Sequence, residues 1–355
     1  MQPTSRRHGL PAVQECAAGT HARRCGGDAA PPTTYCGDRS SAALLTDKDK
    51  GQKKQNNMDF EKTIQLLSDI TNSEMHHYGM EGVPFPSNDI LCQTVNICRS
   101  LLFPGYYGAS IIDPDSLRLQ INVGIIALYN KLRQQIAAGL AFANPGEYGS
   151  RKLLWEEAKE KTCKFIDALP DLRATLSTDV TAHYRNDPAA HNLGEVILCY
   201  PGMKAISSHR IAHKLVELDV PLIPRVIAEL AHSETGIDIN PEARIGKGFA
   251  IDHGTGVVIG ATCVIGDNVT LYQGVTLGAK NFPQNDDGSL VKGIPRHPII
   301  GDNVVVYSNA TILGRITIGE GCVIGGNQWI TQDLPPHTRY FRYCKRTDAD
   351  KPAGH

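Results

Sequence analysis

Two kinds of hydrophobic pattern divide the chain into a helical block and a region of short strands. From Met58 to residue 236, apolar side chains recur every three to four residues, which is the spacing of one face of an α-helix. The segments that show this spacing most clearly are 60–70, 88–103, 113–142, 150–169, 203–218 and 223–235. Such stripes are typical of helices that pack against one another. We therefore expect an all-α domain over residues 58–236.

From Ile239 onward the pattern changes to a period of six. The aliphatic positions that follow it are Ile239, Ile245, Ile251, Ile259, Ile265, Leu271, Leu277, Ile300, Val306, Ile312, Ile318, Ile324 and Ile330. A two-residue shift and an irregular segment, 279–299, interrupt the series. Self-similarity at six residues is the sequence signature of a β-helix, in which three hexads form one triangular coil of about 18 residues. We predict a left-handed parallel β-helix over 237–332, with a little more than four coils.

Glycine usage supports this division. The chain has 355 residues and 34 glycines, and 16 of these glycines lie within 239–330. Glycine, Asp and Asn suit the tight corners of such a prism, because they adopt positive φ at little cost. The expected fold class is thus α+β and multidomain, with an all-α domain before the prism and a tail over 333–355.

Composition excludes several classes of protein. The formal net charge of −1 is unlike the basic excess of nucleic-acid-binding proteins, and the apolar runs fall short of the ~20 residues of a membrane helix. The 10 cysteines are scattered without a C-x-x-C pair, which argues against a disulfide framework and against a structural zinc site. We expect free, mostly buried thiols in the reducing cytoplasm. We also expect the His209–His213 pair to lie at the surface or core edge, not to bind a metal.

Residues 1–57 have no hydrophobic period, and disorder is the default expectation for such a segment. Residues 1–46 hold five Arg and three acidic residues, which is a hint of an organellar transit peptide. Met58 opens the first patterned segment, so translation could also start there. Both alternatives stay open.

Five short motifs carry a family resemblance. They are Arg185–Ala189 (RNDPA), Gly236–Pro241 (GIDINP), Ile251–Gly256 (IDHGTG), Val275–Gly278 (VTLG) and Arg296–Pro298 (RHP). In this order and spacing they resemble the serine acetyltransferases of the hexapeptide-repeat acyltransferase superfamily. The resemblance implies transfer of an acetyl group from acetyl-CoA to the hydroxyl of L-serine, the first step of cysteine biosynthesis. It also implies feedback inhibition by L-cysteine.

The same resemblance implies assembly. In the superfamily three prisms associate side by side, and the active sites lie between neighbouring subunits. The chain is therefore expected to form a homotrimer or a hexamer built as a dimer of trimers. The segment 279–299 would be the loop that reaches the neighbouring subunit.

His253 is the expected general base. Acyl transfer to a hydroxyl needs a group that accepts the hydroxyl proton, and histidine suits this task because its ordinary pKa is about 6.5. The repeat region contains only His253 and His297. Resemblance assigns the base to His253 and its orientation to Asp238. Asp238 lies 15 residues earlier, about one coil, so a hydrogen bond between the two is geometrically reasonable.

The remaining site residues follow from the resemblance and from the charges of serine. Asp187 and Asp252 are assigned to the ammonium group, and Arg296 with His297 to the carboxylate, which an arginine can bind through two parallel hydrogen bonds. Acetyl-CoA is expected along the prism, with contacts near Thr276, Gly278, Ala279, Ser308 and Gly326. A backbone N–H near 278–279 is the candidate oxyanion donor. No metal is expected.

Some positions depart from the family pattern. Ala261 replaces a glutamate, and the late coils read Tyr307-Ser308-Asn309 and Gly325-Gly326-Asn327 where glycine and alanine are usual. A C-terminal isoleucine, through which family members bind O-acetylserine sulfhydrylase, is not present in this sequence. That complex is therefore doubtful, as are details of the contacts to the CoA tail.

Three other functions agree less well with the sequence. A hexapeptide acetyltransferase for a sugar or xenobiotic usually lacks the long helical block. A γ-type carbonic anhydrase needs three histidines around zinc, and the repeat region has only two. A non-catalytic prism scaffold would not need these acidic and basic residues at family spacing.

Overall fold

The computed structural model describes residues 60–69, 79–108, 113–144 and 149–341. The expectations for residues 1–57 and for the end of the C-terminal tail fall outside these ranges. Two compact units divide the chain at Asp69. The first contains helix α1 (Glu61–Leu67), none of whose residues is buried. The second unit contains all the other described helices and strands.

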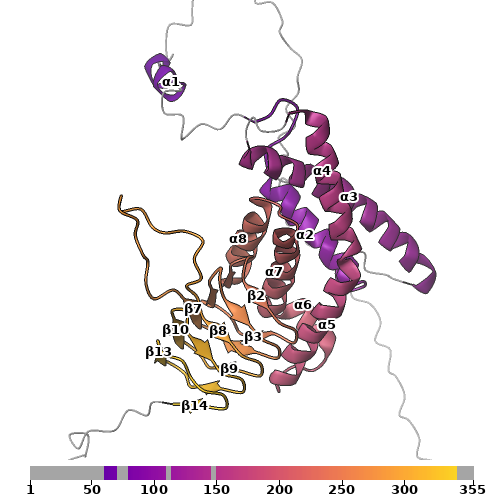
Figure 1. Ribbon diagram of the computed structural model, residues 1–355. Helices are drawn as coiled ribbons and strands as arrows, with labels where there is room; N and C mark the ends of the chain where they lie inside the picture. The colour runs from indigo at the N-terminus through magenta and orange to yellow at the C-terminus, as the bar shows by residue number, and fades with distance from the viewer. Residues whose placement is uncertain (1–59, 70–78, 109–112, 145–148, 342–355) are drawn as a thin grey trace, which may run out of the picture. The chain divides into compact units, whose positions relative to one another are not determined.

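Seven helices precede the strands in the described part of the second unit, which confirms the helical block (Figure 1). Their bounds are α2 (Asn88–Leu102), α3 (Pro114–Ala143), α4 (Arg151–Asp167), α5 (Leu169–Asn186), α6 (Leu193–Cys199), α7 (Pro201–Glu217) and α8 (Ile223–Thr235). Helix α3 packs against α2 and α4, and α7 packs against α8. Helices α5 and α6 were not predicted from the hydrophobic period, and they carry the residues next to the RNDPA motif.

Side-chain caps explain where several helices begin. The side chains of Ser87, Asp113, Ser150 and Asn192 each accept a backbone N–H of the first turn, which satisfies donors that the helix itself leaves unpaired. At the other end of the block, Gly236 follows α8 with φ of 69°. A left-handed residue is a common helix stop, and here it turns the chain from α8 into the first strand.

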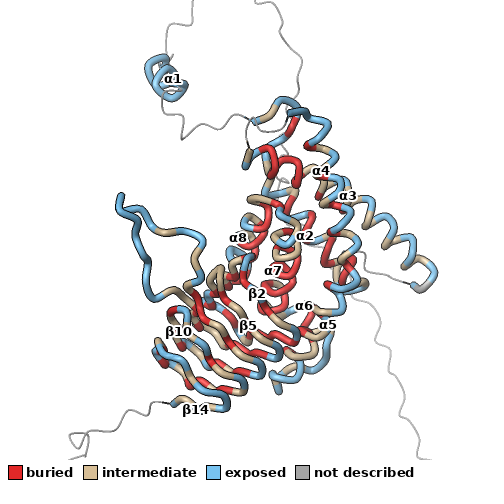
Figure 2. The backbone as a smooth tube through the Cα atoms, in the orientation of Figure 1, coloured by how far each residue is buried: buried red, intermediate tan, exposed pale blue. Residues whose placement is uncertain are grey.

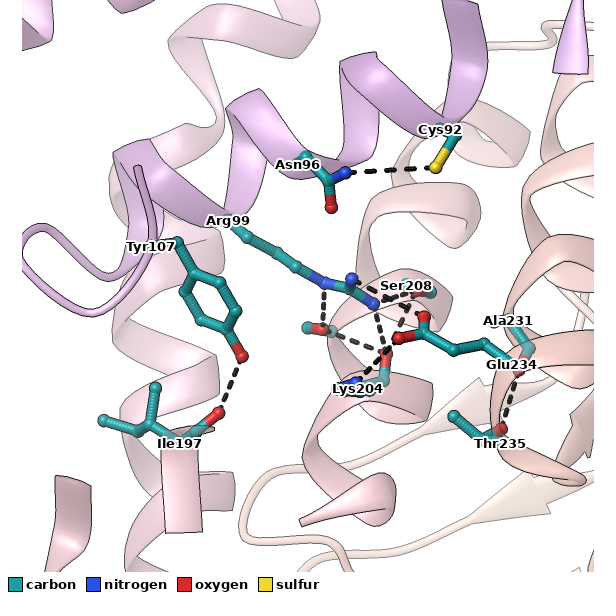
Figure 3. A network of polar contacts seen from close by, with 11 residues as sticks. Cys92, Asn96, Arg99, Tyr107, Ile197, Lys204, Ser208, Ala231, Glu234 and Thr235 are labelled. Atoms are coloured by element: carbon teal, nitrogen blue, oxygen red, sulfur yellow. Dashed lines mark hydrogen bonds and ion pairs between the residues drawn. The ribbon is translucent and has the colours of Figure 1, made fainter. Parts of the chain in front are cut away.

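A buried polar network joins α2 to α7 and α8 (Figure 3). Arg99 is 5% exposed. Its guanidinium donates to Ser207 Oγ at 3.2 Å, to Ser208 Oγ at 2.9 Å and to the carbonyl of Lys204 at 3.0 Å. Lys204 in turn pairs with Glu234 at 2.7 Å. The network fixes α8, and α8 leads directly into the first strand.

The strands form a parallel β-helix with three faces. The strands are β1 (Asp238–Ile239), β2 (Arg244–Ile245), β3 (Ala250–Asp252), β4 (Val258–Ile259), β5 (Val264–Ile265), β6 (Thr270–Tyr272), β7 (Thr276–Gly278), β8 (Ile299–Ile300), β9 (Val305–Val306), β10 (Thr311–Leu313), β11 (Thr317–Ile318), β12 (Val323–Ile324), β13 (Trp329–Ile330) and β14 (Arg339–Tyr340). The three sheets have the orders β1-β4-β7-β10-β13, β11-β8-β5-β2 and β14-β12-β9-β6-β3. The predicted triangular prism is confirmed, and its last ladder strand lies beyond residue 332.

All 13 aliphatic positions of the six-residue period are buried inside this prism (Figure 2). A second inward position, two residues earlier in the hexad, was not predicted. Phe249, Cys263 and Cys322 occupy it and are each at most 1% exposed. Two inward residues per hexad fill the prism, so its interior is a packed core.

Coil length varies in the places where the sequence repeat is interrupted. Asp238 pairs with Val258, so the first coil spans 20 residues, whereas Val258 pairs with Thr276 after 18. The two extra residues lie in the corner between β3 and β4. The longer irregular segment joins β7 to β8 as an exposed loop that projects from the prism in Figure 1.

Helices α5 and α7 are fixed to the first coil by a buried ion pair. The guanidinium of Arg210 donates to both carboxylate oxygens of Asp179 at 3.1 Å. Asp179 also accepts the backbone N–H of Phe249 at 2.9 Å, and Arg210 donates to the carbonyls of Ile245 and Gly246. This ion pair and its hydrogen bonds therefore join the helical block to the prism through buried polar groups.

Two expectations about isolated residues are wrong. Among the six cysteines that the structure describes, all are free, but Cys92, Cys163 and Cys199 are exposed, so the thiols are not mostly buried. His209 is 3% exposed and therefore lies in the core, not at its edge.

No helix in the described ranges is long and apolar enough to cross a membrane.

Candidate active site

His253 lies in the enlarged corner between β3 and β4. Its φ is 56°, and Gly254 and Gly256 follow with φ of 89° and 79°. A Cβ at Gly254 would lie 2.5 Å from Ile237 Cδ1, so only glycine fits there. The His253 side chain is 74% exposed. The corner therefore presents an imidazole outward, on a backbone fixed by the turn.

Asp187 ends helix α5 close to this corner. Its Oδ2 accepts a hydrogen bond from the hydroxyl of Tyr200, and its Oδ1 accepts the backbone N–H of Ala189 at 2.8 Å. The Tyr200 hydrogen bond lowers the pKa of Asp187, and the Ala189 N–H and the charge of His253 lower that pKa further. Asp187 is therefore held as a carboxylate within electrostatic range of the imidazole.

Asp252 is the second acidic group beside His253. Its Oδ1 lies 4.0 Å from His253 Nε2. Behind its strand, the buried His183 accepts the backbone N–H of Ile251 at its Nε2 (3.1 Å), and its Nδ1 bonds to the carbonyl of Asp179 at 2.8 Å. Burial lowers the pKa of His183. A neutral histidine of α5 thus supports the strand that ends in Asp252.

Asp238 occupies a different position from the one expected. Because the first coil is longer, it lies opposite Val258. In the described part of the chain, no hydrogen bond or ion pair joins it to His253. The carboxylate that pairs with His253 is that of Asp252. The role of Asp238 as the orienting group stays a prediction.

His297 is held at the corner between β4 and β5. Its Nδ1 accepts the backbone N–H of Thr262 at 3.1 Å, and the Thr262 hydroxyl accepts the backbone N–H groups of Arg296 and His297 at 2.9 and 3.1 Å. Burial, followed by the charges of Arg296 and Arg315, lowers the pKa of His297. The ring is therefore neutral, with Nδ1 an acceptor and the proton on Nε2.

Arg296 and Arg315 lie on either side of this histidine in the sequence and differ in their partners. Arg315 donates to the carbonyls of Thr262 and His297 at 2.7 and 3.0 Å. The Nε atom of Arg296 is buried and has no hydrogen-bond partner among the described residues. A buried donor without a partner is costly, so a group that could accept from Arg296 would bind favourably here.

The expected acetyl-CoA contacts lie on successive coils. The Ser308 carbonyl accepts the backbone N–H of Asn327 at 2.9 Å, and a Cβ at Gly326 would lie 3.1 Å from that carbonyl oxygen. Thr276 and Gly278 are on β7, opposite Thr311 and Leu313, and Ala279 follows them. Small residues at these corners let a ligand approach the backbone.

The two halves of the expected serine site occupy different corners of one prism. The ammonium side (Asp187, Asp252 and His253) lies before β4, whereas His297 packs on Gly260 after β4. Residues 257–260 alone span roughly 10 Å at about 3.3 Å per residue of extended strand. A single serine molecule is too short to reach both corners.

Sequence reasoning missed several residues at these corners. Tyr200 and His183 come from helices that the hydrophobic period did not indicate, and Tyr272 stacks on Tyr307 at 5.0 Å between ring centroids. Thr262 was not among the predicted site residues. No sequence signal pairs Tyr200 with Asp187, because the contact depends on how α5 and α7 pack.

Among the described residues no group of three possible metal ligands occurs.

The family model described as "Bacterial transferase hexapeptide (six repeats)" matches residues 297–327. A curated relative, "Serine acetyltransferase, plasmid" of Synechococcus elongatus, is 44% identical over 277 residues, which cover 77% of this chain and 87% of the relative. A serine acetyltransferase of Bacillus pumilus is 42% identical over 163 residues, which cover 46% of this chain and 71% of the relative.

Solved structures show the same similarity. The Entamoeba histolytica serine acetyltransferase 1 in complex with L-cysteine is 32% identical, with a TM-score of 0.61, and the match covers 79% of this chain and 94% of that chain. Isoform 3 from the same organism, also in complex with cysteine, is 29% identical with a TM-score of 0.59; its match covers 82% of this chain and 96% of that chain.

Proposed function

Because the chain belongs to the serine acetyltransferase family and is therefore a serine O-acetyltransferase, we propose that His253 is its general base and that two protomers build each active site. The observation that supports this most directly is the outward imidazole of His253 beside two carboxylates. Acyl transfer to a hydroxyl needs such a base in contact with the acceptor.

His253 accepts the hydroxyl proton of L-serine as the serine oxygen attacks, and it returns the proton to the departing sulfur. Acetyl-CoA, when bound, supplies the acetyl thioester. The small residues Gly278 and Gly326 fit the passage of a pantetheine chain close to the backbone. A backbone N–H at 278–279 stabilises the oxyanion, and Asp238 orients the imidazole.

Serine is recognised at both of its charged ends. The ammonium group is bound by Asp187 and Asp252, of which Asp187 stays ionised because of the hydroxyl of Tyr200. The carboxylate is bound by Arg296, whose buried Nε needs an acceptor, and by the neutral Nε2–H of His297. One cation and one neutral donor suit a single carboxylate.

The residues proposed to bind the two ends of serine lie on different corners of the prism, and this separation supports a trimer. His253 of one protomer and Arg296 of the next face the same groove when prisms associate side by side. The high exposure of His253 in a single chain agrees with this arrangement, since a neighbouring prism would cover it. In a hexamer, two such trimers would join, and the helical block is the candidate interface between them.

L-cysteine is the expected inhibitor. Two Entamoeba relatives were solved with cysteine bound, and cysteine has the same ammonium and carboxylate groups as serine. We propose that it occupies the serine site of this chain, so inhibition should be competitive with serine. Asp187→Asn should weaken the binding of both serine and cysteine.

Subunit complementation tests the shared site. His253→Asn and Arg296→Gln are each expected to lose most turnover of L-serine and acetyl-CoA, measured as thiol release. Co-expression of these two variants in equal amounts should restore about one quarter of the wild-type activity. A site is then intact only if its His253 comes from an Arg296→Gln protomer and its Arg296 from a His253→Asn protomer, and each of these has an even chance. The control is co-expression of His253→Asn and Asp187→Asn, which remove residues from the same corner; this mixture should recover no activity beyond that of Asp187→Asn alone. Equal recovery in both mixtures, or none in either, would contradict the two-protomer site.

A further inference from the structure

Tyr200 lies outside the expected serine site and contacts it directly through Asp187. Its hydroxyl donates to Asp187 Oδ2, while the backbone N–H of Ala189 donates to Oδ1 at 2.8 Å. Both oxygens of the carboxylate are therefore bound from the protein side. A carboxylate fixed at two points keeps one orientation of its remaining lone pairs.

The backbone of Tyr200 is itself fixed. The residue ends α6 and precedes Pro201, the first residue of α7. Its N–H donates to the carbonyl of Val196 at 3.3 Å, and its carbonyl accepts the N–H groups of Met203 and Lys204 at 3.1 and 3.3 Å. The phenol therefore extends from a rigid junction between two helices.

That junction abuts the strand of the catalytic corner. A Cβ at Gly202 would lie 2.3 Å from the carbonyl oxygen of Ile251, so α7 starts in direct contact with β3. Asp187 is connected to the same strand through α5, because His183 accepts the N–H of Ile251. Tyr200 and Asp187 thus approach β3, which carries Asp252, from two helices that both contact it.

We infer that Tyr200 is a positioning residue for substrate: it holds the Asp187 carboxylate toward the ammonium group of L-serine. The inference rests on the proposed role of Asp187 as an ammonium ligand. Tyr200 does not touch the reacting atoms, so it should act on the binding of serine and not on acetyl-CoA. The hydrogen bond to Asp187, followed by burial and by the charge of Asp187, raises the pKa of Tyr200, which keeps the phenol protonated as the donor.

The test compares four full-length enzymes: wild type, Tyr200→Phe, Asp187→Asn and Tyr107→Phe. Tyr107 is the matched control, because its hydroxyl also bonds near α6, to the carbonyl of Ile197 at 2.6 Å (Figure 3). Steady-state thiol release gives kcat and the KM of each substrate. A melting curve for each variant reports any loss of folding.

Tyr200→Phe should raise the KM of L-serine by about tenfold, the effect of losing one hydrogen bond to a charged group. It should leave the KM of acetyl-CoA within about twofold and lower the melting temperature by no more than about 2–4 °C. Asp187→Asn should raise the KM of serine by more, and Tyr107→Phe should change neither KM.

Two results would overturn the inference alone. One is an unchanged KM of serine in Tyr200→Phe while Asp187→Asn raises it. The other is a parallel rise in both KM values with a large loss of melting temperature, which would mean a structural role. If Asp187→Asn itself leaves the KM of serine unchanged, the proposed serine site is wrong, and the role of Tyr200 is wrong with it.

Discussion

The imidazole of His297 lies against the backbone of Gly260 so closely that a Cβ at residue 260 would be 2.1 Å from ring Cδ2 and 2.2 Å from Nε2. Thr262 holds the other side of the ring through Nδ1. His297 is 7% exposed. The ring therefore fits between a glycine and a threonine of the preceding coil, and its position depends on the absence of a side chain at 260.

Gly260→Ala should displace the His297 ring and weaken serine binding. We expect the KM of L-serine to rise by about tenfold or more, the effect of losing one charge-assisted hydrogen bond, measured by steady-state thiol release. Gly149→Ala, where an added Cβ meets nothing within 4 Å, should leave the KM unchanged. In a His297→Ala background, Gly260→Ala should have no further effect. A full additional loss there would mean that residue 260 acts through another group.

His253→Asn should lower kcat by about 10²–10⁴-fold, the usual contribution of a general base. Asparagine is the sharper variant, because it tolerates the positive φ of 56° at this position better than alanine. Since the side chain is largely exposed in the single chain, the melting temperature should change little. Retention of more than a tenth of wild-type kcat would exclude His253 as the base.

The buried pair of Asp179 and Arg210 should contribute strongly to stability. Asp179→Ala leaves the Arg210 charge buried without its carboxylate, and it leaves the backbone N–H of Phe249 unpaired. The free energy of unfolding in urea should fall by about 3–5 kcal/mol. Glu229→Gln, which breaks the exposed pair with Arg225, should cost less than about 1 kcal/mol. Equal losses would contradict a special role for the buried joint.

His209 should make the fold sensitive to acid. Burial, then the charges of Arg210 and His213, lowers its pKa well below the ordinary value, and neither ring nitrogen has a hydrogen-bond partner among the described residues. Below about pH 6.5 the unfolded chain therefore binds more protons than the folded chain, so stability falls as pH falls. The ring of His213 stacks on that of His209, with 5.5 Å between the ring centroids.

His209→Phe keeps an aromatic ring and removes the titrating group. Urea unfolding at pH 7.5 and 5.5 should show that wild type loses up to about 1.4 kcal/mol more per pH unit below pH 6.5 than this variant. His191→Gln removes an exposed imidazole and should leave the acid-dependent loss as in wild type. Identical losses in wild type and His209→Phe would show that His209 does not titrate on unfolding.

Much of the fold could be read from the chain because its signals are local and repetitive. All 13 positions of the six-residue period, from Ile239 to Ile330, lie buried inside the prism as predicted. The hydrophobic period did not predict a helix where polar residues interrupt the apolar face of a segment. Helix α5 buries Asp179 and His183 along with its leucines, so polar residues interrupt its apolar face and conceal the helix.

The candidate site was predictable as a set of residues but not as a geometry. The motifs supplied His253, Asp252 and His297, because motif residues stand next to one another in the sequence. The contacts of Tyr200 with Asp187 and of Thr262 with His297 join segments 13 and 35 residues apart. They exist only after helices and coils have packed.

The sequence by itself determined that this chain is a helical block followed by a hexapeptide prism, and it determined which residue types stand at the prism corners, because a repeated hexad leaves one way to bury its aliphatic side chains. The two-residue shift between Ile251 and Ile259 is visible in the sequence, but only the tertiary structure decided which strands pair, so that Asp238 lies opposite Val258. It also decided that the ammonium side and the carboxylate side of the proposed serine site lie on separate corners. Those relationships depend on which strands pair and on which helix packs against which coil, and such long-range packing leaves no local pattern in the sequence.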